Sequence, residues 1–394
     1  MAASRRWLVL AVLFLARAAV AFQFQSVATL APSLVADLGI DYARLGVLIG
    51  FYMLPGVVIA FPGGLLGQRY GDKPVVLCGM VLMTVGGVMT GATHLYAVAV
   101  AGRLIGGVGG VLVNVLLTKM AADWFVGREI GTAMAILVSS WPLGIGLALV
   151  LEPRLAALAG WPASLDATGI AAGAIAVLVA AIYRSPAASV AVPTALAPAG
   201  LSWRETGLVS LAGLVWSLFN VGFNMIFAFA PAMLVAGGQT PAQAGFATSL
   251  STWTIVLSVP LGGVINDRLR AVTVLMTTSF AVIGVAMLVI PLGAALPLLA
   301  VVGLVGGLPA GAIMTLPAEV LRRESRGAGM GVFFTWYYVI MAILPPLAGG
   351  ARDLSGLPGA PVVLGGIAEF LALAVIVLFR LCQAQARAVA GAGD

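Results

Sequence analysis

The sequence predicts an all-α membrane protein with twelve transmembrane helices, arranged as two pseudosymmetric bundles of six helices each. Three observations support this fold class. Of the 394 residues, 61% are hydrophobic and 9% are charged, whereas soluble domains carry roughly 25% charged residues. Apolar stretches long enough to cross a hydrocarbon core about 30 Å thick recur along the whole chain. The first and second halves of the sequence also resemble each other.

Twelve apolar stretches are expected to cross the membrane. Their approximate bounds are 7–33, 44–66, 75–93, 96–120, 130–151, 165–183, 206–234, 242–265, 271–292, 295–318, 327–348 and 358–380. The segments between them are short, so the sequence leaves no room for a soluble domain. The lipid bilayer is therefore the expected surroundings of most of the chain.

The basic residues lie mainly on one side of the predicted membrane. If the N-terminus is cytoplasmic, fifteen Lys and Arg residues face the cytoplasm and only Arg44, Arg154 and Arg352 face outward. This bias is typical of cytoplasmic loops and requires an even number of spans. We therefore expect a multi-pass protein of a bacterial inner membrane with both termini in the cytoplasm. The net charge of +6 is not gathered into a patch that would indicate nucleic-acid binding.

The first apolar stretch also has features of a cleavable signal peptide. Arg5 and Arg6 precede an apolar run that contains the small-residue sequence Ala19-Val20-Ala21. Arg17 would interrupt the region just before cleavage, and removal would leave eleven spans. We therefore interpret this stretch as the first membrane span.

An internal repeat relates the two halves of the chain. An offset of 199 residues aligns Phe24 with Phe223, Ala31-Pro32 with Ala230-Pro231, Gly63-Gly64 with Gly262-Gly263, and Arg69 with Arg268. Many secondary transporters consist of two such repeats packed around a central pathway. We predict an N-terminal bundle at 1–184, a cytoplasmic linker rich in Ala, Pro and Ser at 185–203, and a C-terminal bundle with a short tail at 204–394.

Two motifs resemble those of the major facilitator superfamily. Residues 64–73, Gly-Leu-Leu-Gly-Gln-Arg-Tyr-Gly-Asp-Lys, are similar to the loop that follows the second span in that family, and residues 263–270 form a less complete second copy. Arg103, followed by two glycine pairs, resembles the family's arginine motif in span 4. The resemblance implies the major facilitator fold and a secondary transporter that works by alternating access. We expect a functional monomer without a cofactor.

The resemblance also implies a gating role for the two loops. In the family, the acid of this motif pairs with basic groups and a helix end to hold one conformation closed. The residues that correspond here are Gly64, Arg69, Gly71, Gly263, Asp267 and Arg268. Gln68 stands where the family usually has Asp, so we expect the N-terminal latch to be the weaker one. Alternatively, these charges only anchor the loops at the lipid headgroups.

Arg17 lies near the middle of the first span. A charged side chain at this depth costs about 2.5–3.5 kcal/mol on insertion scales, which makes it a candidate functional group. No acidic residue of spans 1, 2, 4 or 5 lies near the midplane to pair with it. A guanidinium that faces a water-filled cavity would bind a carboxylate or an inorganic anion. Alternatively, Arg17 bonds to helix carbonyls or polar side chains and stabilises the bundle.

Pseudosymmetry and depth indicate further solute-binding candidates. The repeat places Trp216 at the position of Arg17, and Trp216, Asn220 and Asn224 share one helix face. Aromatic residues in the middle of spans 5 and 11 lie too deep for an interfacial belt. The candidates are Arg17, Phe24, Gln25, Trp141, Trp216, Asn220, Phe223, Asn224, Trp336 and Tyr337. The two asparagine amides could instead bond to neighbouring helices.

Two other intramembrane charges are candidates for coupling transport to protons. Arg103 lies toward the outer end of span 4, and three roles stay open for it: direct contact with the solute, proton linkage and helix packing. Glu369 lies in span 12, where burial without a partner would let it bind a proton near neutral pH. Alternatively, Glu369 is bonded locally and has no part in coupling.

The sequence favours transport over catalysis. It contains no zinc-binding His-Glu-x-x-His motif, no phosphate-binding Gly-x-x-x-x-Gly-Lys loop and no Cys/His cluster, so we expect neither an enzyme nor a metal site. Arg17 favours a small organic or inorganic anion as solute, moved by proton symport or by antiport of two anions. The alternative is proton-driven efflux of drugs or amphipathic metabolites. The aromatic candidates fit either function.

Overall fold

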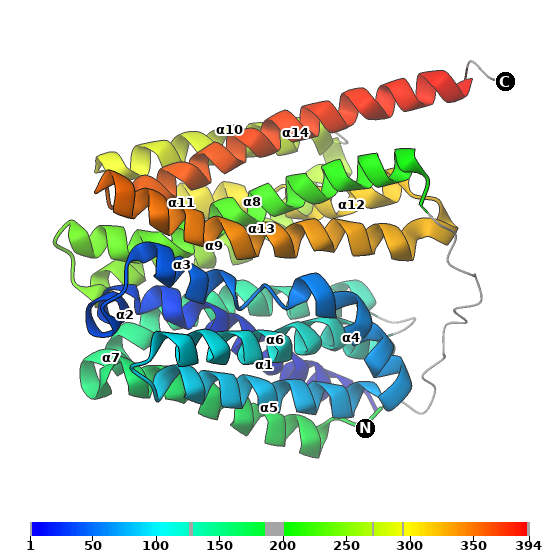
Figure 1. Cartoon of the computed structure of the whole chain (residues 1–394). Coiled ribbons are helices and arrows are strands. Elements are labelled where there is room, and N and C mark those ends of the chain that lie inside the picture. Colours follow the sequence, from blue (N-terminus) through cyan, green and yellow to red (C-terminus); the bar gives the residue numbers. More distant parts are fainter. Residues whose placement is uncertain (1, 126–128, 186–200, 270–271, 294, 392–394) are drawn as a thin grey trace.

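The computed structural model describes residues 2–125, 129–185, 201–269, 272–293 and 295–391 as two helical bundles (Figure 1). The N-terminal half contains α1 (Ala2–Thr29), α2 (Ala31–Leu38), α3 (Tyr42–Gly50), α4 (Gly56–Tyr70), α5 (Asp72–Gly91), α6 (Tyr96–Phe125) and α7 (Ile130–Ile182). The C-terminal half contains α8 (Trp203–Ala236), α9 (Pro241–Leu269), α10 (Val272–Val289), the 3-10 turn η1 (Ile290–Leu292), α11 (Ala295–Gly306), α12 (Ala310–Val320), the 3-10 turn η2 (Arg323–Ser325), α13 (Arg326–Ser355) and α14 (Ala360–Gly391). The predicted linker lies almost entirely outside the described residues.

The helices account for the twelve predicted spans. Ten segments of the described residues are long and apolar enough to cross a membrane. One of them holds two spans, because α7 bends at Gly160, whose φ of 82° and ψ of 161° are not helical. Beyond the bend, the Ser164 hydroxyl donates to the Glu152 carbonyl at 3.3 Å, although a continuous helix would separate these residues by about 18 Å. The short helices α3 and α4 form another span through the hydrogen-bonded turns between Gly50 and Val57.

The two halves use the same packing scheme, which confirms the internal repeat. In the N-terminal half, α1 packs on α7 and α5 packs on α6; in the C-terminal half, α8 packs on α13 and α10 packs on α11. In the same way, α5 contacts α7 and α10 contacts α14. The second part of α7 and α14 thus occupy equivalent places in the two bundles.

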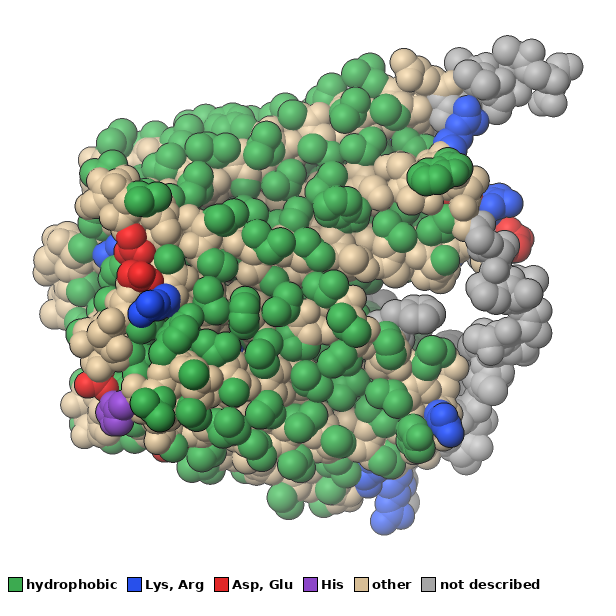
Figure 2. Space-filling model, in the orientation of Figure 1, with side chains coloured by type: hydrophobic (Ala, Val, Ile, Leu, Met, Phe, Trp, Pro, Cys, Tyr) green, Lys and Arg blue, Asp and Glu red, His purple; other side chains and the backbone are tan. Residues whose placement is uncertain are grey.

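The molecule has an apolar girdle and two polar ends. Figure 2 shows hydrophobic side chains over the middle of the visible face, with Lys, Arg, Asp, Glu and His at the two ends. The start of α1 and the end of α14 lie at the same end, here called the terminal end (Figure 1). This arrangement agrees with an even number of membrane passages.

At the terminal end, each half has an ion pair between its first helix and the segment that precedes its fifth span. In the N-terminal half, Arg6 Nη2 donates to Glu129 Oε2 at 2.5 Å. In the C-terminal half, Arg322 donates from Nε and Nη2 to the Glu205 carboxylate at 3.0 and 2.9 Å. The repeat therefore conserves the position of this pair but reverses its polarity.

The halves meet closely at the end opposite the terminal end. Helix α3 packs on α13, where Gly46 lies against the Pro345 carbonyl and Gly50 against that of Ala342. At the start of α3, the backbone N–H groups of Tyr42 and Ala43 donate to the Asp353 carboxylate at 3.1 and 2.8 Å. At the terminal end, Figure 2 shows a notch between the two halves. The structure is thus closed at the opposite end.

Candidate substrate site

A cavity lies between the two halves, near the middle of their helices. It is a narrow cavity of about 20 Å³, which is room for roughly one water molecule. The lining residues are Val20, Tyr52, Met53, Gly110, Val111, Asn114 and Trp141 from the N-terminal half, and Tyr337 and Tyr338 from α13. A central cavity with walls from both halves is where an alternating-access transporter holds its solute.

Arg17 lies one helical turn before Val20, on the side of the cavity toward the terminal end. Its Nε donates to Asn114 Oδ1 at 2.9 Å, and its Nη1 donates to the Leu137 carbonyl at 3.0 Å. These bonds fix the guanidinium beside the cavity and within electrostatic reach of Tyr337 and Tyr338. Among the described side chains, no carboxylate forms an ion pair with Arg17. Its charge is therefore solvated by neutral dipoles.

Aromatic rings form the rest of the site. Phe24 lies between Tyr52 and Trp141, with ring centroids 6.0 and 5.9 Å away. On the C-terminal half, the ring centroids of Trp216 and Tyr337 lie 6.4 Å apart. Tyr338 packs against Gly56 of the N-terminal half, where the missing side chain makes room for its ring. Of the predicted residues, Trp141 and Tyr337 thus line the cavity, and Phe24 and Trp216 pack against lining residues.

The other predicted binding residues have different surroundings. Gln25 is buried and donates from Nε2 to the Phe227 carbonyl at 2.7 Å, which joins the two halves. Asn220 donates to the carbonyl of Trp216 in its own helix at 2.8 Å, whereas the buried Nδ2 of Asn224 has no partner among the described residues. These three side chains therefore lie outside the residues that line the cavity.

Phe223 and Trp336 also lie away from the cavity wall. Phe223 packs against Gly306 of α11 within the C-terminal bundle. Trp336 is 36% exposed on α13, next to the lining residue Tyr337. The cavity wall includes the next two residues of the helix, Tyr337 and Tyr338, but not Trp336.

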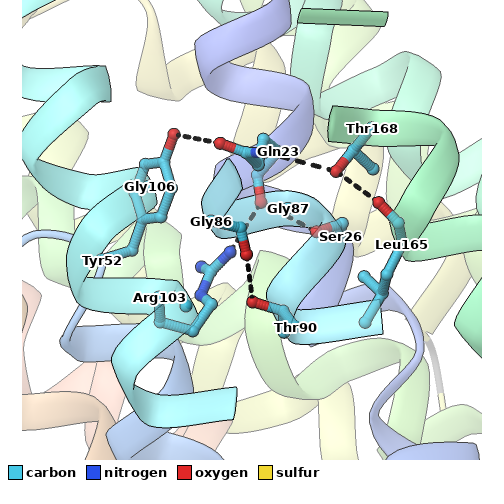
Figure 3. Close-up of a pocket in the computed structure, with 11 residues that line it drawn as sticks. Gln23, Ser26, Tyr52, Gly86, Gly87, Thr90, Arg103, Gly106, Leu165 and Thr168 are labelled. Atoms are coloured by element: carbon cyan, nitrogen blue, oxygen red, sulfur yellow. Dashed lines mark hydrogen bonds between the residues drawn. The ribbon is translucent and has the colours of Figure 1, made fainter. Parts of the chain in front are cut away.

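Arg103 belongs to a buried polar cluster inside the N-terminal half. It is 2% exposed and donates to the carbonyls of Leu48, Gln23 and Phe24 at 2.8, 2.8 and 3.0 Å. Its guanidinium also lies 4.4 Å from the ring centroid of Tyr52. Figure 3 shows Gln23 between Tyr52 and Thr168, with hydrogen bonds to both. Arg103 therefore ties α6 to α1 and α3, in agreement with a packing role.

Replacing Arg103 by Leu is expected to lower the stability of the protein by about 1–3 kcal/mol, because the substitution removes the donor to three buried backbone carbonyls. Thermal unfolding in detergent, followed by intrinsic tryptophan fluorescence, measures the effect. Arg154→Leu serves as control because Arg154 is exposed. Equal unfolding temperatures for the two variants would contradict the packing role.

The loop residues assigned to gating lie at the terminal end. Gly71 joins α4 to α5 with a φ of 87°, a conformation that glycine adopts without strain. The acid of this loop is Asp72, which pairs with Lys119 of α6 at 2.5 Å. Gly64 and Gly263 have open space beside their Cα atoms, and Arg69 is exposed. The side chains of Asp267 and Arg268 lie outside the described part of the chain.

Sequence reasoning missed Gln23 and Tyr52, and it gave Asn114 and Tyr338, which lie deep in spans 4 and 11, less weight than the selected candidates. Gln23 and Asn114 are amides in the middle of apolar spans, which is the signal that could have identified them. Tyr52 lies within the break between α3 and α4, where Pro55 interrupts regular helix. Among the described residues, no group of three or more His, Cys, Asp or Glu side chains could hold a metal ion.

Solved structures with the same fold are transporters. A bacterial homolog of the human lysosomal transporter Spinster, in an inward-facing and unoccupied conformation, matches with a TM-score of 0.74 at 16% identity, over 96% of each chain. The nucleoside transporter NupG matches with a TM-score of 0.71 at 14% identity, over 95% of this chain and 99% of NupG.

Curated relatives match over shorter segments. The quinolone resistance protein NorA of Staphylococcus aureus is 29% identical over 120 residues, which cover 29% of this chain and 31% of NorA. The acurin A biosynthesis cluster MFS-type transporter of Aspergillus aculeatus is 27% identical over 139 residues, which cover 35% of this chain and 25% of that protein. The chain thus spans only a quarter to a third of the length of these relatives.

A family profile covers nearly the whole chain. The profile described as Major Facilitator Superfamily matches residues 13–239 and 218–394. The two matches overlap at residues 218–239 and together span residues 13–394, and the fold agrees with that of the solved transporters. This chain therefore belongs to the Major Facilitator Superfamily and has the fold of a multi-pass membrane protein.

Proposed function

We propose that this transporter moves a small organic anion across a bacterial inner membrane by alternating access. The observation that supports this solute class is Arg17, a cation held beside the central cavity without a carboxylate partner among the described residues. A planar carboxylate is the natural ligand of a guanidinium, since two oxygens can accept parallel N–H bonds. Nη2 of Arg17 makes no hydrogen bond to the described residues and is available to an anion.

The aromatic walls favour an organic over an inorganic anion. Trp141, Tyr337 and Tyr338 offer apolar ring faces, and the two tyrosine hydroxyls add polar groups near Arg17. Sites for small molecules combine such apolar walls with few polar groups that fix orientation. An anion that carries a ring or a short apolar body would thus contact both parts of the site.

The charge bias of the sequence supports a cytoplasmic location for the terminal end. On this assignment, the closed contact between α3 and α13 faces outward and the notch faces the cytoplasm. Binding of the anion between Arg17 of one half and the tyrosines of the other gives it contacts to both bundles. A solute with such contacts favours a conformation in which the halves approach each other around the cavity.

Reconstitution into liposomes tests the proposed solute class. Radiolabelled 4-hydroxybenzoate, lactate, nitrate and tetraphenylphosphonium are compared, with flux into protein-free liposomes subtracted. We expect saturable counterflow of the organic carboxylates, with 4-hydroxybenzoate the best substrate. Flux of the tetraphenylphosphonium cation without flux of any anion would contradict the proposal.

Efflux of amphipathic compounds is the second candidate function. The similarity to NorA over 120 residues and the aromatic cavity walls support it. A cationic drug would be repelled by Arg17, whereas an amphipathic anion would fit both functions. The same panel separates the two candidates, because efflux of cations predicts transport of tetraphenylphosphonium.

A further inference from the structure

Glu369 is a buried carboxyl group in the interior of the C-terminal bundle. It lies nine residues after the start of α14, about 13 Å along the helix from its first residue. Its exposed fraction is 0%, and neither carboxyl oxygen has a hydrogen-bond partner among the described residues. Other buried acids differ in this respect, since Glu152 accepts a hydrogen bond from Ser164 and Glu205 is bonded to Arg322.

The surroundings of Glu369 are closely packed and apolar. Its carboxyl group lies directly against Gly222 of α8, where any larger side chain would collide with Oε1. One turn earlier on α14, Gly365 contacts Met225 of α8 and Met287 of α10. The glycines bring α8 and α14 so close together that the carboxyl group is enclosed by protein.

No charged group of the neighbouring elements pairs with Glu369. Helix α10 and the turn η1 contain no titratable side chain. The titratable groups of the other elements packed on α14 are Arg204 and Glu205 on α8, and Arg326, Tyr337, Tyr338, Arg352 and Asp353 on α13. None of them forms a hydrogen bond or an ion pair with the carboxyl group. An isolated carboxylate in such a site costs several kcal/mol more than the neutral acid.

From this placement we propose that Glu369 is a proton-binding site that couples the protein's transport to proton movement. The inference rests on the proposed function for its solute. The step is an acid–base equilibrium in which the carboxylate takes up one proton and becomes the neutral acid. The packing described here fits the neutral form, and loss of the proton requires water to enter between α8 and α14.

Helix α8 connects Glu369 to the boundary between the halves. Gly222 faces the carboxyl group, whereas the Phe227 carbonyl of the same helix accepts the bond from Gln25 across the boundary. Trp216, also on α8, contacts the cavity residue Tyr337. A shift of α8 that admits water to Glu369 therefore changes contacts at the cavity, which links the proton equilibrium to the conformational equilibrium.

Two measurements on wild type and Glu369→Gln test this proposal. In proteoliposomes, uptake of radiolabelled 4-hydroxybenzoate is driven by a pH gradient, and its counterflow is measured separately without a gradient. We expect Glu369→Gln to lower gradient-driven accumulation at least tenfold and to keep counterflow within twofold of wild type. The matched control Glu152→Gln removes another buried acid and is expected to retain both activities.

Infrared spectroscopy gives a readout that does not depend on transport. The wild-type protein and Glu152→Gln are both expected to show, at neutral pH, the carbonyl band that belongs to protonated Glu369, and the Glu369→Gln spectrum is expected to lack this component. Identical spectra would overturn the proton site. Equal gradient-driven accumulation in wild type and Glu369→Gln would overturn the coupling while leaving the proposed solute intact. Absence of flux of every anion in wild type would instead overturn the proposed function, and the coupling with it.

Discussion

Replacing Arg17 by Gln is expected to raise the KM for an organic anion by roughly 10- to 100-fold, since a hydrogen bond to a charged group contributes about 1.5–3 kcal/mol. Gln keeps a side-chain donor for Asn114, so the packing of α1 on α6 is largely preserved. Arg17→Lys keeps the charge without the planar pair of donors and is expected to give an intermediate KM. The KM values of wild type, Arg17→Gln and Arg17→Lys are measured from the saturation kinetics of counterflow in proteoliposomes.

A purely structural role of Arg17 would give a different result. If Arg17 only stabilises the bundle, Arg17→Gln will lower the unfolding temperature and the amount of folded protein but leave the KM unchanged. Thermal unfolding of the same preparations separates this result from a loss of solute binding. An unchanged KM would remove the main support for an anionic solute.

Replacing Gly46 by Leu is expected to abolish transport by preventing closure of the end opposite the terminal end. Gly46 lies directly against the Pro345 carbonyl, so even a Cβ atom would overlap with the backbone of α13. The larger side chain forces α3 away from α13 and favours the conformation that is open at this end. Spin labels at Ala92 and Leu354, in a background without Cys78 and Cys382, measure the distance between the halves by pulsed electron resonance.

Gly207→Leu provides the control for the Gly46 substitution. No atom lies within 4 Å of the place where a Cβ on Gly207 would sit, and the residue is exposed on α8. Its distance distribution and flux are expected to match those of the parent protein. A wild-type distance distribution in Gly46→Leu would show that the contact between α3 and α13 does not control this closure.

Most of the fold was predictable because membrane spans follow from local composition. The helix bounds in the structure differ from the predicted span bounds where the backbone departs from a regular helix. The second span breaks between Gly50 and Gly56, and the tenth breaks between α11 and α12, just before Pro309. The loop expected at 152–164 is helical on both sides of Gly160. In each case glycine and proline permit a local change that an apolar pattern does not reveal.

The candidate site was only partly predictable, because its geometry depends on how helices rotate against one another. The depth of Arg17 was visible in the sequence, but its partner Asn114 lies 97 residues away on α6. Sequence could not decide whether Trp336 or Tyr337 faces the cavity, since this depends on the packing of α13. The burial of Tyr338 against Gly56 joins the two halves and has no local signal.

The reversed ion pairs at the terminal end have a consequence for assembly of the protein in the membrane. Arg6 matches Glu129, and Glu205 matches Arg322, only when each segment folds onto its own bundle. A segment that docked on the other half would bring Arg322 to Arg6 or Glu129 to Glu205. Such like-charge contacts disfavour the wrong partner. The opposite polarity of the two ion pairs thus disfavours exchange of helices between two bundles that have similar sequences while the protein is being made.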